Sequence, residues 1–182
     1  MKRFLNIRSG SAAAILLAAA LPACSADNYE SMGTITASIG GQSYNGITLA
    51  QTSRHDSSAT FRLMGGMTLI VIQGHDPGAG SMTENVISLE ASLMGADASS
   101  SAYEVKLLYW PEGMSGPFYT NDQTGHEVSL VWDTLSLAGE ARASGSFETM
   151  VCYQAGYFSE VDVSNCMDVT GRFETELDRR EL

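Results

Sequence analysis

Two short segments near the C-terminus share one pattern: residues 143–147 read Ala-Ser-Gly-Ser-Phe, and residues 169–173 read Val-Thr-Gly-Arg-Phe. Cys152 and Cys166 lie between the two segments. Outside the cytoplasm, two late cysteines of this kind are most simply explained as a disulfide. The segments therefore predict two antiparallel strands that are joined by a bond between Cys152 and Cys166.

The cysteine pair fixes which residues of the two strands face each other. If the cysteines are directly opposite, the numbers of facing residues sum to 318. Phe147 then faces Gly171, and Phe173 faces Gly145. Each ring would cover the bare backbone of a glycine, an arrangement that helps to fix strand register. The disulfide and the aromatic packing thus predict the same register independently.

Strand patterns continue back along the chain to Gly33. Residues 87, 89, 91 and 93 are apolar and alternate with polar or charged residues, as in a half-buried strand. Gly40-Gly41 and Gly65-Gly66 mark tight turns between such segments. Strands at this spacing predict an all-β domain over residues 33–182, an antiparallel β-sandwich or open barrel of about eight to ten strands.

Two segments give more specific predictions. Residues 67–72 are apolar on both faces, which favours a central strand covered on both sides. Residues 135–141 are compatible with a single helical turn at an edge of the domain. We expect no other helix in the mature chain.

The N-terminus has the features of a secretory signal. Lys2, Arg3 and Arg8 form a basic start, and an apolar run of 12 residues, 11–22, follows. A membrane-spanning helix needs about 20 residues. Residues 1–23 are therefore interpreted as a cleaved signal peptide.

The end of this signal, Leu21-Pro22-Ala23-Cys24, resembles the lipobox of bacterial lipoproteins, although Pro22 departs from its usual pattern. The resemblance implies that the chain is cut before Cys24, which then carries the lipid. Ser25 stands where an aspartate favours retention in the inner membrane, so the resemblance implies an outer-membrane location, on the periplasmic side. Ordinary signal cleavage after Ala26 is the alternative.

Removal of residues 1–23 leaves a polar tether, residues 24–32, before the domain. The remaining chain holds seven basic and 21 acidic residues, a formal net charge of −14. Such a charge repels phosphate backbones and anionic lipid surfaces, so we expect no nucleic-acid partner. Contact with the membrane is expected through the lipid anchor only.

Taken together, the layout is similar to small, uncharacterised bacterial lipoproteins with an antiparallel sandwich or open-barrel domain. The similarity rests on the opening segment, residues 33–41, and on the strand at residues 144–147. It implies an exported envelope protein but assigns no site residue.

No motif for catalysis or for cofactor binding occurs. The chain lacks HExxH, CxxC and Gly-x-Ser-x-Gly patterns, and we expect no cofactor. Its three histidines are His55, His75 and His126. A metal site or an enzyme site could be assembled from loops that carry His75, Asp76 and His126, but solvated loop histidines are the favoured interpretation.

Two further groups of side chains have a functional and a structural interpretation. Oxygen-bearing side chains near the second cysteine could hold Ca²⁺, although a solvated acidic loop is favoured: Glu160, Asp162, Asn165 and Asp168. Aromatic residues in the middle of the chain could form a platform for a ligand or glycan, although core and edge packing is favoured: Tyr103, Tyr109, Trp110, Phe118 and Tyr119.

The sequence therefore favours a non-enzymatic envelope module that binds an unknown envelope protein or a small ligand. A metal-binding protein or enzyme with a site near His75 and His126 is the alternative, and a purely structural lipoprotein is a third hypothesis.

Overall fold

A computed structural model describes residues 29–51 and 56–181 of the chain, and this part contains strands and no helix. The strands are β1 (Tyr29–Ile39), β2 (Gln42–Gln51), β3 (Asp56–Ser57), β4 (Ala59–Met64), β5 (Met67–His75), β6 (Val86–Leu93), β7 (Ala102–Trp110), β8 (Phe118–Thr120), β9 (Ser129–Ser136), β10 (Arg142–Gln154), β11 (Val161–Glu176) and β12 (Asp178–Arg179). The prediction of an all-β domain is confirmed. The described residues include no helix long and apolar enough to cross a lipid bilayer.

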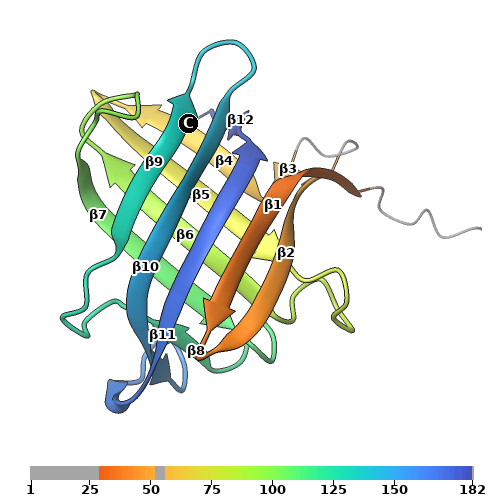
Figure 1. Ribbon diagram of the computed structural model, residues 1–182, viewed down its shortest axis with the longest axis vertical. Helices are drawn as coiled ribbons and strands as arrows, with labels where there is room; N and C mark the ends of the chain where they lie inside the picture. Colours follow the sequence, from red (N-terminus) through yellow and green to blue (C-terminus); the bar gives the residue numbers. More distant parts are fainter. Residues whose placement is uncertain (1–28, 52–55, 182) are drawn as a thin grey trace, which may run out of the picture.

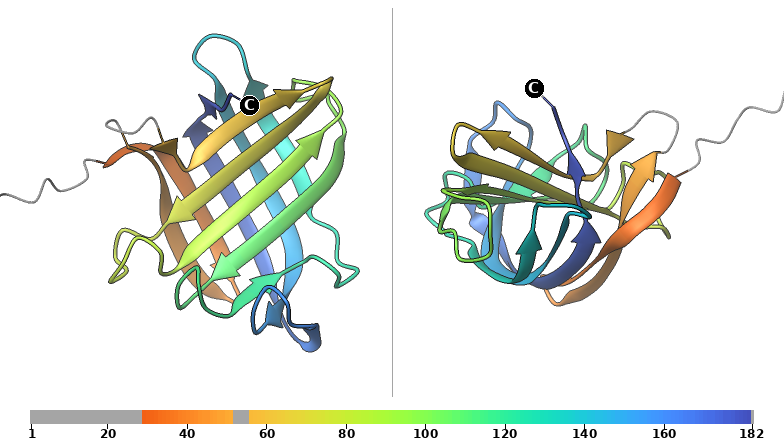
Figure 2. Two further views of the ribbon diagram at one scale, coloured as in Figure 1. Left: turned by 180° about the vertical axis from the view of Figure 1, so that it is seen from behind. Right: turned by 90° about the horizontal axis from the view of Figure 1, so that it is seen from above.

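All twelve strands belong to one mixed sheet that folds back over itself. In Figure 1 the layer nearer the viewer contains β9, β10, β11, β1 and β2, and β4 to β7 run diagonally behind it. The two further views show the same two facing layers from behind and from above (Figure 2). Their apolar sides face each other, so the core lies between the layers.

The two layers are joined by hydrogen bonding along both sides. On one side the short strand β8 pairs with both β7 and β10. On the other side β2 pairs with β5 at Ile47 and His75, and Ser58 connects the same two strands. The Ser58 hydroxyl accepts a bond from the Leu49 N–H and donates one to the Gln73 carbonyl. The sheet therefore forms a partial ring.

Beyond the end of β8, the edge of β7 is covered by the side chain of Asn121. Its Oδ1 accepts a bond from the Leu107 N–H, and its Nδ2 donates to the carbonyls of Val105 and His126. An asparagine side chain can replace a neighbouring strand in this way because it carries both a donor and an acceptor.

The core follows from the alternation of apolar residues along the strands. It includes the fully buried side chains of Ile35, Ile70, Ile72, Leu89, Leu107, Phe147 and Val169. These residues come from both layers, so each layer buries one face against the other.

The predicted register of the last hairpin is confirmed. Phe147 pairs with Gly171 and Gly145 pairs with Phe173 across β10 and β11. A Cβ atom added at Gly171 would clash with Cζ of Phe147, and one added at Gly145 would lie 3.0 Å from Cζ of Phe173. Each ring therefore occupies the space that a side chain at the opposite glycine would need.

The cysteine pair also lies as predicted. Cys152 and Cys166 face each other in the ladder, with their Cα atoms 4.0 Å apart, and they form a disulfide. Immediately after Cys152 the ladder shifts, so that Tyr153 pairs with Asp162. The disulfide therefore marks the last pair before the irregular end of the hairpin.

Several boundaries differ from the prediction. Residues 29–51 and 56–181 contain twelve strands rather than eight to ten, because β3 and β12 have two residues each and are too short to show a periodic pattern. β1 begins at Tyr29, so residues 29–32 belong to the sheet and not to the tether. β12 runs parallel to β4, so the sheet is not purely antiparallel. The signal peptide, Cys24 and the rest of the tether lie outside the described residues.

One more specific prediction was wrong, and another was right only in part, because β5 lies centrally between β4 and β6 but is not covered on both faces. Leu135 lies in β9 and pairs with Ala143, so the segment that begins there contains no helical turn. In β5, Thr68, Ile70 and Ile72 are buried, but Leu69 and Val71 are only half-buried. Apolar side chains on both faces therefore do not mean that both faces are covered.

Candidate functional site

Four tyrosine side chains form a row at one end of the folded sheet. The ring centroids are 6.4 Å apart between Tyr44 and Tyr109, 6.3 Å between Tyr109 and Tyr119, and 5.7 Å between Tyr119 and Tyr153. Aromatic pairs attract each other at these separations. We call these four residues the tyrosine row.

Strand pairing explains why these residues lie together. Tyr119, in β8, pairs with Tyr109 of β7 on one side and with Tyr153 of β10 on the other. Tyr44, in β2, completes the row from the facing layer, and its ring meets that of Tyr109 edge-on. The row therefore extends from the β8 bridge, at Tyr119, to β2 on the other side of the folded sheet, at Tyr44.

Hydrogen bonds hold two of the rings in place. The Tyr44 hydroxyl donates to the Gly74 carbonyl at 2.7 Å, and the Tyr109 hydroxyl donates to Asn85 Oδ1 at 2.8 Å. Asn85 in turn donates through Nδ2 to the carboxylate of Asp76. Burial raises the pKa of both tyrosines, so their hydroxyls stay protonated and continue to donate.

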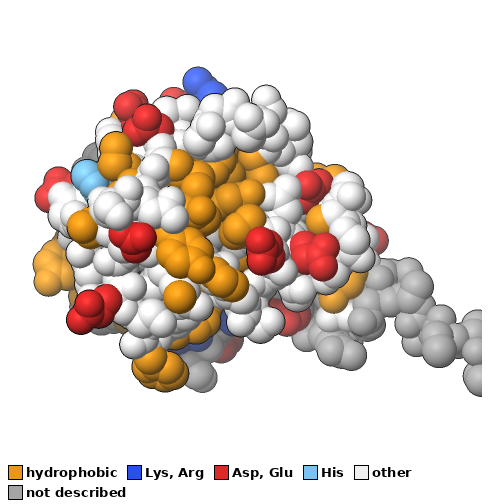
Figure 3. Space-filling model, turned by 90° about the horizontal axis from the view of Figure 1, so that it is seen from below, with side chains coloured by type: hydrophobic (Ala, Val, Ile, Leu, Met, Phe, Trp, Pro, Cys, Tyr) orange, Lys and Arg blue, Asp and Glu red, His pale blue; other side chains and the backbone are white. Residues whose placement is uncertain are grey.

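Three members of the row, Tyr109, Tyr119 and Tyr153, are only partly buried. Seen from this end, Figure 3 shows hydrophobic side chains gathered at the centre of the surface, with acidic side chains around them. Asp76 is close enough to act on the charge state of both Tyr44 and Tyr109. Asp162, which is exposed, pairs with Tyr153. Tyr109, Tyr119 and Tyr153 thus form a partly exposed aromatic surface, with Asp76 near one end and Asp162 paired with Tyr153 in the ladder at the other.

The basic side chains that form ion pairs do so with acidic groups other than those beside the tyrosine row. Five of the Lys and Arg side chains in the described residues form ion pairs with acidic groups: Lys106, Arg142, Arg172, Arg179 and Arg180. None of these ion pairs includes Asp76 or Asp162. The charge that surrounds the tyrosine row is therefore negative.

The aromatic residues that the sequence singled out are divided among three places. Tyr109 and Tyr119 belong to the row. Trp110 and Phe118 are buried with Val86 in a separate small cluster, as the packing interpretation expects. Tyr103 is 74% exposed and lies in neither group. Tyr44 and Tyr153 were missed, because they lie far from this segment in sequence.

The histidines do not form the metal site that was considered. His75 is buried, its Nδ1 is 2.7 Å from the Met82 carbonyl, and burial lowers its pKa. A neutral ring bonded in this way has a structural role. Within residues 29–51 and 56–181, the only close group of metal-ligating side chains is His126, Cys152 and Cys166, which includes neither His75 nor Asp76. His55 lies outside the described residues.

The acidic residues near Cys166 do not form a ligand group in this part of the chain either. The Asp162 carboxylate accepts hydrogen bonds from the backbone N–H and the hydroxyl of Ser164, which lower its pKa. Such bonds are typical of a turn formed by aspartate.

No protein-family model, curated protein or solved structure matches this chain.

Proposed function

We propose that this chain is an exported, non-enzymatic envelope protein whose β-domain binds a small organic cation at the tyrosine row. The supporting observation is the row itself: three partly buried rings, with Tyr119 in contact with both Tyr109 and Tyr153, and acidic residues near both ends. The anchor would be a lipid on Cys24, on the periplasmic side of the outer membrane, as the lipobox resemblance implies.

The physical basis is the charge distribution of an aromatic ring. The face of a tyrosine ring is negative, and a cation over that face gains about 0.5–1 kcal/mol at an exposed site and about 2 kcal/mol where water is excluded. Carboxylates nearby, such as Asp76, add a long-range attraction for the same charge. The same negative charges repel an anionic ligand. The site therefore favours cationic over anionic ligands of the same size.

Binding can be tested with three one-ring compounds that differ mainly in charge: phenyltrimethylammonium, benzyl alcohol and benzenesulfonate. We expect the cation to bind to the mature domain in calorimetric titrations. Replacement of both Tyr119 and Tyr153 by leucine should weaken this binding about fivefold to thirtyfold, as expected for the loss of two cation–ring contacts at an exposed site.

Tyr103→Leu is the matched control, because Tyr103 is an exposed tyrosine outside the row. It should bind the cation like the unmodified protein. Equal binding of all three compounds, or an equal loss in the Tyr103 variant, would contradict a cation site at the row.

Lipidation of Cys24 is tested separately. Intact-mass spectrometry of the membrane fraction should find a chain that begins at Cys24 and carries acyl groups. Cys24→Ser should release the protein into the soluble fraction, because the apolar anchor is lost. A mature chain that starts at Asp27 without acyl mass would show ordinary signal cleavage after Ala26 instead.

We also propose to class the folded sheet as an open barrel rather than a sandwich. Hydrogen bonding continues from one layer to the other on both sides, through β8 and through the Ile47–His75 pair. Two separate sheets of a sandwich would not share strands in this way.

A further inference from the structure

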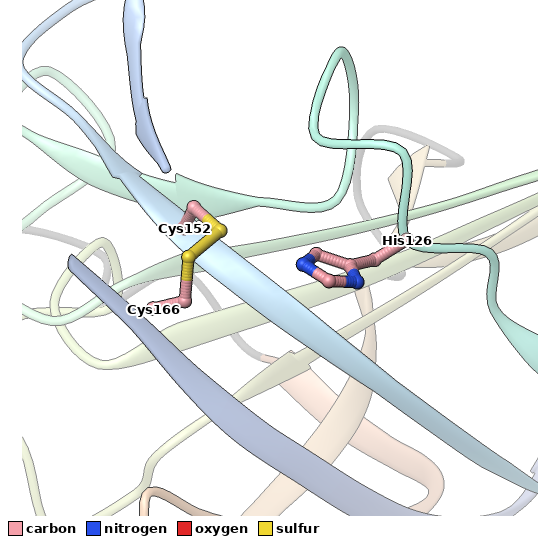
Figure 4. Close-up of side chains that lie close together, drawn as sticks. All are labelled: His126, Cys152 and Cys166. Carbon is pink, nitrogen blue, oxygen red and sulfur yellow. A yellow bond between two sulfur atoms is a disulfide. The ribbon is translucent and has the colours of Figure 1, made fainter. Parts of the chain in front are cut away.

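The imidazole of His126 lies beside the disulfide at the end of the last hairpin. In Figure 4 its ring points toward the two sulfur atoms. A ring nitrogen of His126 and the Sγ atoms of Cys152 and Cys166 all lie within 4.8 Å of one another. The tyrosine row involves none of these three residues.

His126 is held in this place by its own backbone. Its N–H donates to Thr124 Oγ1, and its carbonyl accepts a bond from Asn121 Nδ2. Asn121 is buried and also bonds the edge of β7. The histidine is therefore fixed against the hairpin by the same side chain that closes the edge of the sheet.

We propose that the Cys152–Cys166 disulfide is a redox switch, and that its reduction creates a Zn²⁺ site formed by His126, Cys152 and Cys166. Two thiolates and one imidazole are a donor set that Zn²⁺ binds tightly. Zn–S bonds of about 2.3 Å and Zn–N bonds of about 2.0–2.1 Å place the donors of a tetrahedral site about 3.5–3.8 Å apart. The three donor atoms need only small movements to reach these separations. Solvent would take the fourth position.

The reduction follows ordinary thiol–disulfide exchange. Cys166 is partly exposed and Cys152 is fully buried, so a dithiol reductant attacks Sγ of Cys166. This step breaks the S–S bond, forms a mixed disulfide at Cys166 and releases Cys152 as a thiolate. The second thiol of the reductant then releases Cys166 and leaves as a cyclic disulfide. In total two electrons and two protons pass to the protein, and Zn²⁺ binding displaces the two protons.

The hairpin does not depend on the disulfide for its register. Ten further pairs, from Arg142 with Glu176 to Val151 with Met167, continue the same ladder away from the cysteines. Phe147 and Phe173 fix that ladder through their contacts with the opposite glycines. The three ligands therefore stay close together when the sulfur–sulfur bond is broken.

Co²⁺ is a suitable reporter, because thiolate ligands give it an intense near-ultraviolet charge-transfer band and tetrahedral geometry gives it strong visible bands. The mature protein, with Cys24 replaced by serine, is reduced with a water-soluble phosphine under nitrogen and titrated with Co²⁺ and then with Zn²⁺. We expect one equivalent of Co²⁺ to bind with thiolate bands, and Zn²⁺ to displace it. The oxidised protein should show no such bands.

Variants distinguish a metal site formed by these three residues from nonspecific metal binding by free thiols. His126→Ala should weaken Zn²⁺ binding at least about tenfold, and Cys152→Ser with Cys166→Ser should abolish the thiolate bands. Glu127→Ala is the matched control, because it changes an exposed neighbour of His126 that is not a ligand, and its affinity should be unchanged. Circular dichroism of the reduced protein should retain the β spectrum.

Four results would overturn the proposal: no thiolate bands in the reduced protein, equal binding by the oxidised protein, unchanged Zn²⁺ affinity in His126→Ala, or unfolding of the domain on reduction. Because none of these measurements involves the tyrosine row, their outcome is independent of the cation-binding proposal.

Discussion

Replacement of Phe173 by alanine should lower the free energy of unfolding by about 3–5 kcal/mol, the range for a buried phenylalanine. The ring is buried, stacks on Phe147 at a centroid distance of 6.5 Å and meets Trp132 edge-on at 5.5 Å. It also covers Gly145. Its loss therefore removes packing in the core and uncovers backbone at the same time. Urea denaturation followed by fluorescence measures the change.

Phe158 provides the control for this substitution. It is fully exposed in the loop between β10 and β11, so Phe158→Ala should change stability by no more than about 0.5 kcal/mol. A loss of stability at Phe173 no greater than at Phe158 would show that the ring does not contribute to the core as described.

Removal of the disulfide is expected to have the second largest effect. Cys152→Ala combined with Cys166→Ala should cost about 3 kcal/mol, because the bond closes a loop of about 15 residues in the unfolded chain. The separation between the two cysteines is 14 positions. On a domain with a stability of about 5–15 kcal/mol, the variant should still fold. Thermal and urea denaturation of the variant measure the loss.

Reduction of the unmodified protein, with a chelator present to exclude metal, provides a comparison. It should reduce stability by a similar amount, because both changes remove the same cross-link. A variant as stable as the oxidised protein would argue against a cross-link that constrains the unfolded chain.

The part of the fold that was predicted in most detail is the part with two independent constraints. The cysteines and the Gly-x-Phe segments each specify the register of β10 against β11, and the structure has that register. For the other strands the sequence shows only an alternation of apolar and polar residues. Alternation reveals which residues share a face, but it does not say which strand lies beside which. The pairing of β1 with β11 was therefore not predicted.

The tyrosine row could be predicted only in part for the same reason. Tyr109 and Tyr119 lie close in sequence, and both were singled out. Tyr44 and Tyr153 join them only because β2 and β10 are brought to the same end by pairings between distant strands. Tyr103 shares their sequence neighbourhood, but it lies at the start of β7, away from the row. Whether a tyrosine belongs to the row is therefore decided by pairing between distant strands and not by local composition.

The proximity of His126 to the disulfide gave no signal in sequence at all. No fixed spacing links the three ligands, because the cysteines are positioned by the hairpin and the histidine by Asn121. The error at Leu135 has a different origin. Leucine and alanine favour helices in isolation, but pairing of Leu135 with Ala143 overrides that preference.

The pairing of β1 with β11 has a consequence for the order in which the chain folds. Residues 33–39 form a ladder with residues 169–175. The first strand, β1, therefore cannot complete its pairing until the last long strand, β11, is available. Contacts between such distant segments close slowly, because the entropy of a long loop is lost before the contact is made. During synthesis, β1 therefore remains without this partner until nearly the whole domain has emerged. Under the export that we propose, the β1–β11 ladder can therefore form only after residues 169–175 have crossed the membrane.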